Sequence, residues 1–242
     1  MKVFISPAKK MTTGQPGIRN PHYIEECISI ANELKAKDAQ TLARILEISK
    51  PLAELNTQRY ADFTQENLEH HGEAALFTYA GDVYQHWQPT QFDHEAIDFI
   101  DEHFLIVSAL YGLLRPLDRM LPYRLEMKNK VYFKGQLVQK FWHNRLTDQL
   151  KEINEPIVLL CSQEYQKALN LTGKHVIEIN FKEWRDDQLK TIAVNAKRAR
   201  GMMAAFISQN QIIEPNDLKG FDSGDYKWSS NHSNERQLTF IK

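Results

Sequence analysis

The feature that most constrains the fold is an apolar run in the middle of the chain, followed at once by a charged loop. Residues 104–110 read FLIVSAL, without a charged residue. A short run of this kind, rich in β-branched and aromatic residues, is typical of a strand buried on both faces of a parallel sheet. Because open α/β sheets bind ligands beyond the carboxyl ends of their strands, we expect a site in the segment that follows.

That segment is stiff and densely charged. Gly112 ends the apolar run, and Pro116 and Pro122 restrict the backbone beyond it. The polar candidates here are Arg115, Asp118, Arg119, Tyr123, Arg124 and Glu126. Guanidinium groups so close together need acidic partners or a bound anion, and arginine binds carboxylate or phosphate through two hydrogen bonds. Two interpretations stay open: an anion site, or a structural network in which the two acids neutralise two of the arginines.

Further apolar runs predict a sheet of several strands with helices between them. The expected strands cover residues 2–5, 157–161, 175–181 and 191–194, with weaker edge strands at 131–133 and 238–241. Helical periodicity is found near residues 22–34, 64–76, 92–103, 137–153 and 195–207. We therefore predict an α/β (mixed α+β) fold, with one compact domain over residues 1–242 and a central sheet flanked by helices.

A pair of short helices is predicted in the N-terminal quarter of the chain. Asp38 is placed to cap the first helix, and Pro51 interrupts and restarts the pattern. Two helices joined by so short a turn form an αα-hairpin, here spanning residues 38–63. Such a helix-hairpin-helix-like element contacts the DNA backbone in some proteins and only packs against the core in others, so both roles stay open.

A pair of cations follows the first expected strand. Ser6 and Pro7 are typical of a helix entry, and Lys9 and Lys10 come directly after them. A strand that leads into a helix start beside two lysines fits a phosphate site, because backbone N–H groups and positive charge converge there. An ordinary surface turn would look the same.

The helix expected at 195–207 carries Lys197, Arg198 and Arg200 in its first turns. The helix dipole disfavours each positive charge at that end by ~0.3–1 kcal/mol. A local rule broken in this way points to function, here phosphate binding. The alternative is that nearby acids, such as Asp186 and Asp187, neutralise the cations.

Two further segments supply candidate side chains for the same cleft. Asp82 and Tyr84 follow Gly81, and Ser162 follows the strand expected at 157–161. Asp82 is a candidate acid, although aspartate beside glycine is common in turns. Cys161 ends an apolar strand, where cysteine is usually buried and inert.

Composition narrows the classes of function. The 242 residues carry a formal net charge of −1, which excludes a protein coated in positive charge but allows a local basic face. Two cysteines make no disulfide framework, and no signal peptide or ~20-residue apolar span occurs, so we expect a cytoplasmic protein without membrane association. No P-loop, dinucleotide fingerprint or zinc motif is present, and we expect no cofactor and no metal ion.

Several of these segments together resemble one family. They are Ile5-Ser6-Pro7-Ala8-Lys9, Gly81-Asp82-Val83-Tyr84, Arg115-Pro116-Leu117-Asp118 with Pro122-Tyr123-Arg124-Leu125-Glu126-Met127, Ser162-Gln163-Glu164-Tyr165, and Lys197-Arg198-Ala199-Arg200-Gly201. In this order and over essentially the full length, they resemble the YaaA family of bacterial peroxide-stress proteins.

The resemblance implies a cytoplasmic protein that limits the damage iron and peroxide do to DNA and protein. It also implies DNA binding through a positively charged cleft and a helix-hairpin-helix-like element, for which residues 38–63 are the candidate. The turn of that hairpin departs from the usual pattern because residues 49–53 contain no glycine. The resemblance does not decide whether the protein is an enzyme, and no catalytic residue is assigned.

Three functions are hypotheses at this point. In the first, which we favour, DNA (double-stranded or a distorted duplex) binds the cations, and Tyr84 or Tyr123 stacks on an exposed base. The phosphate-binding candidates are Lys9, Lys10, Arg115, Arg119, Arg124, Lys197, Arg198 and Arg200.

In the second hypothesis, the same cations hold a nucleotide or modified nucleobase in a deep pocket, and Asp82, Asp118 or Glu126 performs acid–base chemistry. A cluster that joins Ser6, Asp82, Arg115, Tyr123 and Ser162 would favour this enzyme. The third, direct handling of iron, has the least support because no compact set of histidines and carboxylates occurs.

Overall fold

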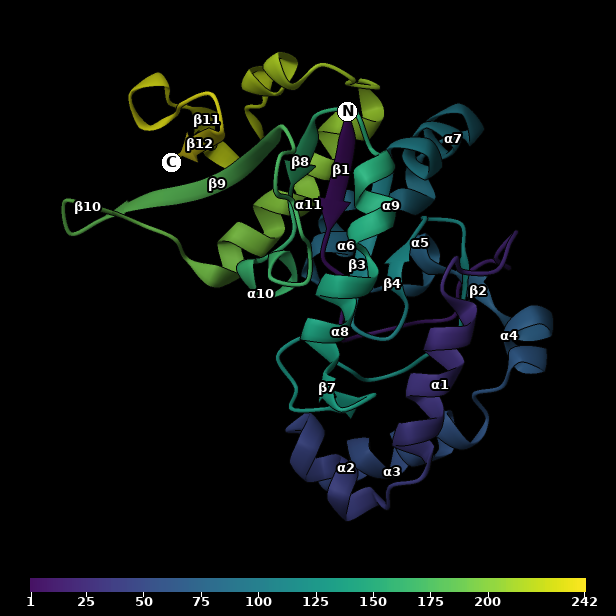
Figure 1. Ribbon diagram of the computed structural model, residues 1–242. Coiled ribbons are helices and arrows are strands. Elements are labelled where there is room, and N and C mark those ends of the chain that lie inside the picture. The colour runs from purple at the N-terminus through teal and green to yellow at the C-terminus, as the bar shows by residue number, and fades with distance from the viewer.

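A mixed sheet runs through the molecule, and the first strand of the chain lies inside it, between β8 and β3 (Figure 1). The computed structural model describes residues 1–242. The strand order is β11-β12-β9-β8-β1-β3-β4, and β10 pairs with β9 off this path. Strands β3 (Phe104–Ser108) and β8 (Ile157–Leu159) both pair in parallel with β1 (Lys2–Ile5). Phe4 thereby lies opposite Leu105 on one side and Leu159 on the other.

The outer strands extend the sheet in both directions. β9 (Val176–Arg185) pairs in parallel with β8 and with β12 (Gln237–Ile241). β4 (Gly112–Leu114) and β11 (Lys227–Trp228) are antiparallel to β3 and β12. Each main strand predicted from an apolar run is present except the one expected at 191–194. There the chain turns back at Asp186 and Asp187, both with positive φ, to form β10 (Gln188–Lys190), and a helix begins at Ala193.

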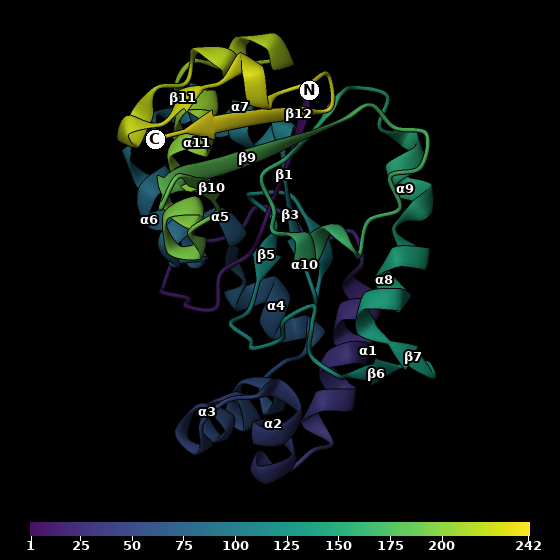
Figure 2. The same cartoon turned by 90° about the vertical axis from the view of Figure 1, so that its left-hand side faces the viewer.

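Helices cover both faces of the sheet, which confirms the predicted fold class. Figure 2 shows α6 (Asp82–Trp87) and α11 (Ala193–Gln209) on one side of the sheet and α8 (Val138–Arg145) and α9 (Thr147–Glu152) on the other. The remaining elements are α1 (Ile24–Lys35), α4 (Gln65–His71), β2 (Glu73–Ala74), α5 (Ala75–Thr78), η1 (Pro89–Gln91), α7 (His94–His103), β5 (Arg119–Met120), β6 (Tyr132–Phe133), β7 (Gln136–Leu137), α10 (Gln163–Gln166), η2 (Pro215–Gly220), η3 (Ser223–Asp225) and η4 (Ser230–His232).

The predicted helix pair forms at one end of the molecule, beside α1 (Figure 1). It consists of α2 (Ala39–Leu46) and α3 (Lys50–Ala61), and the Asp38 carboxylate caps α2 by accepting a hydrogen bond from the Thr41 N–H at 2.7 Å. Two bonds fasten the pair to residues 120–130. The Tyr60 hydroxyl donates to the Arg124 carbonyl at 2.7 Å, and Asn129 Nδ2 donates to the Leu46 carbonyl at 3.2 Å.

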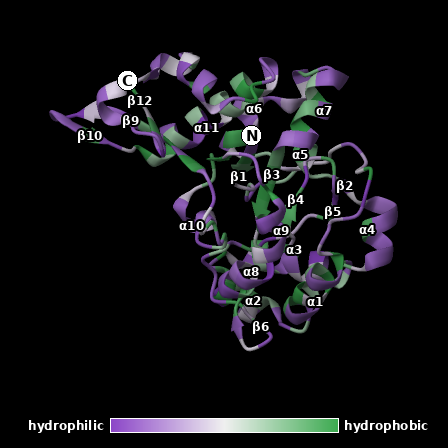
Figure 3. Ribbon diagram, turned by 45° about the horizontal axis from the view of Figure 1, so that its top comes forward, coloured by the Kyte–Doolittle hydropathy of each residue, from purple (hydrophilic) through white to green (hydrophobic).

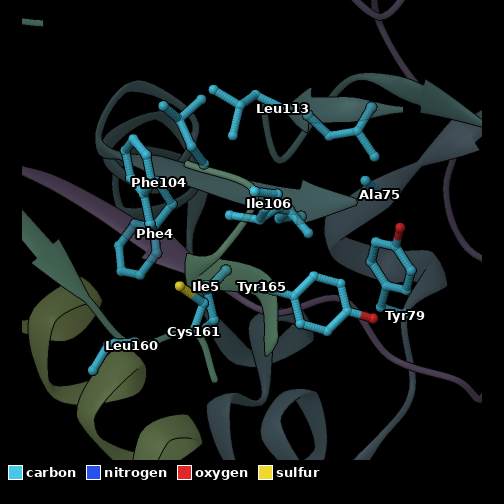
Figure 4. Packing of buried hydrophobic residues seen from close by; sticks show 14 of the residues in the cluster. Phe4, Ile5, Ala75, Tyr79, Phe104, Ile106, Leu113, Leu160, Cys161 and Tyr165 are labelled. Atoms are coloured by element: carbon cyan, nitrogen blue, oxygen red, sulfur yellow. The ribbon is translucent and has the colours of Figure 1, made fainter. Parts of the chain in front are cut away.

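One hydrophobic cluster of 66 buried residues includes both Met1 and Phe240. Figure 3 shows that the hydrophobic stretches concentrate on the central strands, whereas α4 and the outer turns are hydrophilic. Figure 4 shows part of the cluster, with residues of β1, β3 and β4 and the buried rings of Tyr79 and Tyr165. No helix has both the length and the apolar composition needed to cross a membrane.

Candidate functional site

The chain reverses its direction of progress across the sheet at β1. After β1 it continues to β3 on one side, and it later returns to β8 on the other side and moves outward to β9. The segments that leave β1 and β8 therefore diverge, which opens a crevice at the carboxyl ends of these two strands. A pocket of about 480 Å³ lies there. Its volume is in the range of small-molecule sites, ~300–1,000 Å³.

Ser6 and Ser162 line this pocket at the two strand ends. The backbone N–H of Ser162 donates to Ser6 Oγ at 2.9 Å, and the Tyr84 hydroxyl donates to the Ser6 carbonyl at 3.2 Å. These bonds tie the loops after β1 and β8 to each other and to α6. The Ser6 hydroxyl accepts from Ser162, so its own hydrogen is free to be donated to a ligand.

Helices α6 and α11 together form one wall of the pocket, and they pack very close to each other. A Cβ atom on Gly201 would be 2.2 Å from the Val83 carbonyl oxygen, so only glycine permits this approach. Lys197 and Arg200, three positions apart on one helical face, line the pocket together with Asp82 of α6.

Arg200 brings an unpaired charge to this wall. Its Nε atom is buried without a hydrogen-bond partner. Burial lowers the pKa of Arg200, and the one neighbouring group that opposes this effect is the Cys161 thiol rather than a carboxylate. Since a buried cation without a partner is costly, an anion in the pocket would stabilise this arrangement.

Glu126 lies in a different part of the pocket and is already paired. Its carboxylate accepts from Lys9 Nζ at 2.5 Å through Oε2 and from Arg124 Nη2 at 3.2 Å through Oε1. The Glu126 side chain is only 6% exposed, and its backbone N–H donates to Asn129 Oδ1 at 2.7 Å. This ion pair confirms that an acid of the central segment neutralises one of its arginines.

A separate small hollow, of about 10 Å³, adjoins the pocket at Glu126, away from α11. Glu126 and Tyr165 line both spaces, whereas Tyr123 and Arg124 line only the hollow. No residue of α6 or α11 reaches it. The site therefore has two ends, one formed by α6 and α11 and the other by Glu126 and Tyr165.

Comparison with known proteins agrees with the resemblance described above. The family described as "Peroxide stress protein YaaA" matches residues 1–232. The chain belongs to the YaaA family of peroxide stress proteins.

Curated relatives of this YaaA-family chain are similar over nearly their whole length. A UPF0246 protein of Francisella philomiragia is 34% identical over 254 residues, covering 100% of both chains. One from Bordetella petrii is 34% identical, covering 99% of this chain and 98% of the relative. One from Polynucleobacter necessarius is 37% identical, covering 94% and 93%.

In this YaaA-family structure, eight of the residues predicted from sequence meet in the pocket. They are Ser6, Lys9, Lys10, Asp82, Glu126, Ser162, Lys197 and Arg200. Sequence reasoning missed Gln85, Lys128, Glu164 and Tyr165, which also line it. Glu164 and Tyr165 directly follow Ser162, and their position after a strand end was the available signal.

Arg115, Asp118 and Arg119 do not line the pocket. The charged residues of the central segment therefore do not form the single cluster that the sequence suggested. Asp118 is 1% exposed and accepts from Arg19 Nε at 2.7 Å and from the Arg115 N–H at 2.8 Å. Burial raises the pKa of Asp118 to about 6, against the effect of these donors. Arg19 also binds Asp101 at 2.6 Å. For Asp118 the structural interpretation is therefore correct, and the proposed cleft role is not.

Arg115 and Arg119 also have their contacts outside the pocket. The Arg115 side chain is 55% exposed, with its Nε 3.6 Å from Asp118. Arg119 donates to Asn20 Oδ1 at 3.3 Å. Arg198 is exposed on α11 and also lies outside the pocket lining.

Tyr84 and Tyr123 are not available to stack on a base. They are 3% and 2% exposed, and both lie in the core. The Tyr123 hydroxyl is 2.9 Å from the Tyr79 hydroxyl and 2.7 Å from Ser108 Oγ. Burial raises the pKa of Tyr123 to about 12 and likewise that of Cys161 to about 12, so neither is ionised at neutral pH.

A second cavity, of about 650 Å³, lies at the opposite edge of the sheet beside Trp228. Lys219 is the one lysine or arginine that lines it, against Glu214 and Glu235, so its charge does not favour an anion. No three His, Cys, Asp or Glu side chains gather in a geometry suited to a metal ion.

Proposed function

We propose that this protein acts in the cytoplasmic response to peroxide stress by binding DNA through the pocket at β1 and β8. DNA held there would be protected from iron and peroxide. The proposal is supported by the lining charges: five cations against Asp82, Glu126 and Glu164. The five are Lys9, Lys10, Lys128, Lys197 and Arg200. A chain with a net charge of −1 thus concentrates an excess of positive charge in one place.

The observation that carries the proposal is the unpaired Arg200 guanidinium beside Lys197. By contrast, the buried carboxylates Asp118 and Glu126 both have cationic partners. Phosphate oxygens are the natural partners for an arginine and a lysine presented together by one helix.

The αα-hairpin α2–α3 adjoins the pocket through one ion pair. Glu47, in the turn between the two helices, binds the pocket residue Lys128 at 3.2 Å. We propose that the hairpin adds backbone contacts to those of the pocket, as the family resemblance implies.

Fluorescence anisotropy of labelled duplex, bubbled and single-stranded DNA across a salt series tests the proposal. Lys197→Ala and Arg198→Ala form a matched pair, because both residues are exposed on α11 and only Lys197 lines the pocket. We expect wild-type affinity to fall linearly on a log–log salt plot, with a slope shallower by about 1 in Lys197→Ala and unchanged in Arg198→Ala. No binding at low salt would exclude DNA. An effect of Arg198→Ala alone would place DNA on another face.

A second candidate is an enzyme that acts on a nucleotide or a modified nucleobase. It is supported by the meeting of Ser6, Asp82 and Ser162 in one pocket that also contains Glu126, although Arg115 and Tyr123 do not join them. Asp82 and Glu126 would be its acid–base groups. Chromatography of nucleotides incubated with wild type, Asp82→Asn and Glu126→Gln tests it, and conversion that survives in both variants would exclude these roles.

A further inference from the structure

We infer that the pocket is a mononucleotide site, with the phosphate at the α11 end and an amino-bearing base, guanine foremost, at Glu126. The inference deepens the proposed function and rests on its premise that the pocket holds phosphate. It follows from the different chemistry of the two ends.

At the α11 end, positive charge exceeds negative charge. Lys197 forms no ion pair, and Arg200 Nε is buried without a partner, whereas Asp82 is the one carboxylate that α6 and α11 contribute. The Ser6 hydroxyl adds a free hydrogen-bond donor at the nearby strand end. A phosphate dianion fits this set of donors.

At the other end, two cations hold one buried carboxylate, and an acceptor remains. Lys9 and Arg124 neutralise Glu126, and each takes one of the lone-pair positions of its carboxylate. A carboxylate offers about four such positions, so acceptor capacity is left over. A second phosphate here would meet a buried carboxylate, whereas an N–H group would find an acceptor.

The surroundings of Glu126 fit a flat ring. Pro7, Ala8 and Tyr165 line the pocket beside it, and the Tyr165 side chain extends from the segment after β8 (Figure 4). The backbone of Tyr165 forms hydrogen bonds within the protein, but its hydroxyl group forms none. The hydroxyl is therefore free to bind a ligand. Ala8 and Tyr165 give this mostly polar pocket a small apolar face on which a flat ring can lie.

The acceptor determines which base is preferred. Guanine presents adjacent N1–H and N2–H donors that one carboxylate can accept, whereas thymine presents one N–H between two carbonyl oxygens, which a carboxylate repels. Well-placed pairs of this kind are worth ~1–3 kcal/mol of discrimination. We therefore expect dGMP to bind roughly tenfold or more tightly than dTMP.

Isothermal titration calorimetry on the full chain, with dGMP, dTMP, deoxyguanosine and inorganic phosphate, tests the inference. We expect dGMP to bind best, deoxyguanosine at least about tenfold more weakly, and phosphate to compete with dGMP. Glu126→Gln should equalise dGMP and dTMP while phosphate binding is retained. Lys197→Ala should weaken every phosphate-bearing ligand, and Lys140→Ala, an exposed lysine on α8, should weaken none.

Equal affinity for dGMP and dTMP in the wild type would overturn the inference, and this comparison needs no variant. An unchanged ratio in a folded Glu126→Gln would also overturn it. DNA binding measured on the same samples separates the two proposals. Duplex binding that depends on Lys197, without binding of any mononucleotide, would refute the inference alone. Binding of dGMP without DNA binding would refute the DNA proposal alone.

Discussion

Gly201→Ala should destabilise the protein, although helix propensity alone predicts the opposite. In the interior of an exposed helix, replacing glycine by alanine stabilises by ~0.5–1 kcal/mol. At Gly201 the added methyl carbon would be 2.2 Å from the Val83 carbonyl oxygen and 2.9 Å from His86 Cβ. Since real Cβ contacts essentially never fall below 3.0 Å, α11 and α6 must separate by about 0.8 Å.

The expected size follows from what that separation disturbs. The buried face of α11 includes Ala199, Met203, Ala204 and Ile207, which lose contacts if the helix moves. Overpacking of a close-packed interior costs ~1–3 kcal/mol. After the gain in helix propensity, we expect the free energy of unfolding to fall by about 1 kcal/mol and the melting temperature to fall by roughly 2–4 °C.

Urea unfolding followed by circular dichroism measures this change. Gly220→Ala is the matched control, because its nearest non-neighbouring atom would be the Phe206 ring at 3.7 Å. We expect Gly220→Ala to stay within about 0.5 kcal/mol of wild type. If Gly201→Ala proved as stable as wild type or more so, the argument that glycine is needed for this helix contact would be wrong.

Two further substitutions probe buried hydrogen bonds. Tyr123→Phe should lower the free energy of unfolding in urea by ~1–3 kcal/mol, because it leaves the buried Tyr79 hydroxyl without this partner. Tyr132 is 64% exposed, so Tyr132→Phe should change nothing. Equal effects of the two substitutions would contradict this reasoning. Glu183→Gln should cost ~1–3 kcal/mol at neutral pH. Burial raises the pKa of Glu183, but donors from Tyr226, Asn195 and Arg185 lower it below its ordinary 4.5. Its stabilisation is therefore present above that pH and lost as the pH falls through the folded-state pKa, so the variant should lose less stability in acid than wild type. If the free energies of unfolding of variant and wild type changed equally with pH, the charge of Glu183 would not contribute to stability.

The inner strands were predictable because a strand buried on both faces needs a short run of apolar residues, and such runs are visible in the sequence. Lys2–Ile5, Phe104–Ser108 and Ile157–Leu159 are almost wholly apolar, as parallel strands under helices must be. Ser6 was a candidate as a helix entry beside two lysines and Ser162 as the residue after a strand, and the structure brings them within hydrogen-bond distance.

Three-dimensional partners were not predictable from position along the chain. Arg115 and Arg124 are nine positions apart, but one lies near Asp118 and the other binds Glu126 at the pocket. Lys9, the other partner of Glu126, is 117 positions away from it, and no local pattern marks such a pair. Tyr84 and Tyr123 lie in polar segments that suggest a role in stacking on a base, whereas their rings are buried and their hydroxyl groups have partners within the protein.

The position of β1 inside the sheet, paired on both sides, has a consequence for biosynthesis. β3 begins about 100 residues after β1, and β8 begins about 155 residues after it. At ribosomal rates of ~5–20 residues per second, β1 waits roughly 5–20 s for its first neighbour and roughly 8–30 s for its second. During that time an apolar strand with both edges unpaired is exposed beside the ribosome, where it can aggregate or bind a chaperone. Trimming the first five residues, which many proteins tolerate, would here remove the strand on which the rest of the sheet assembles.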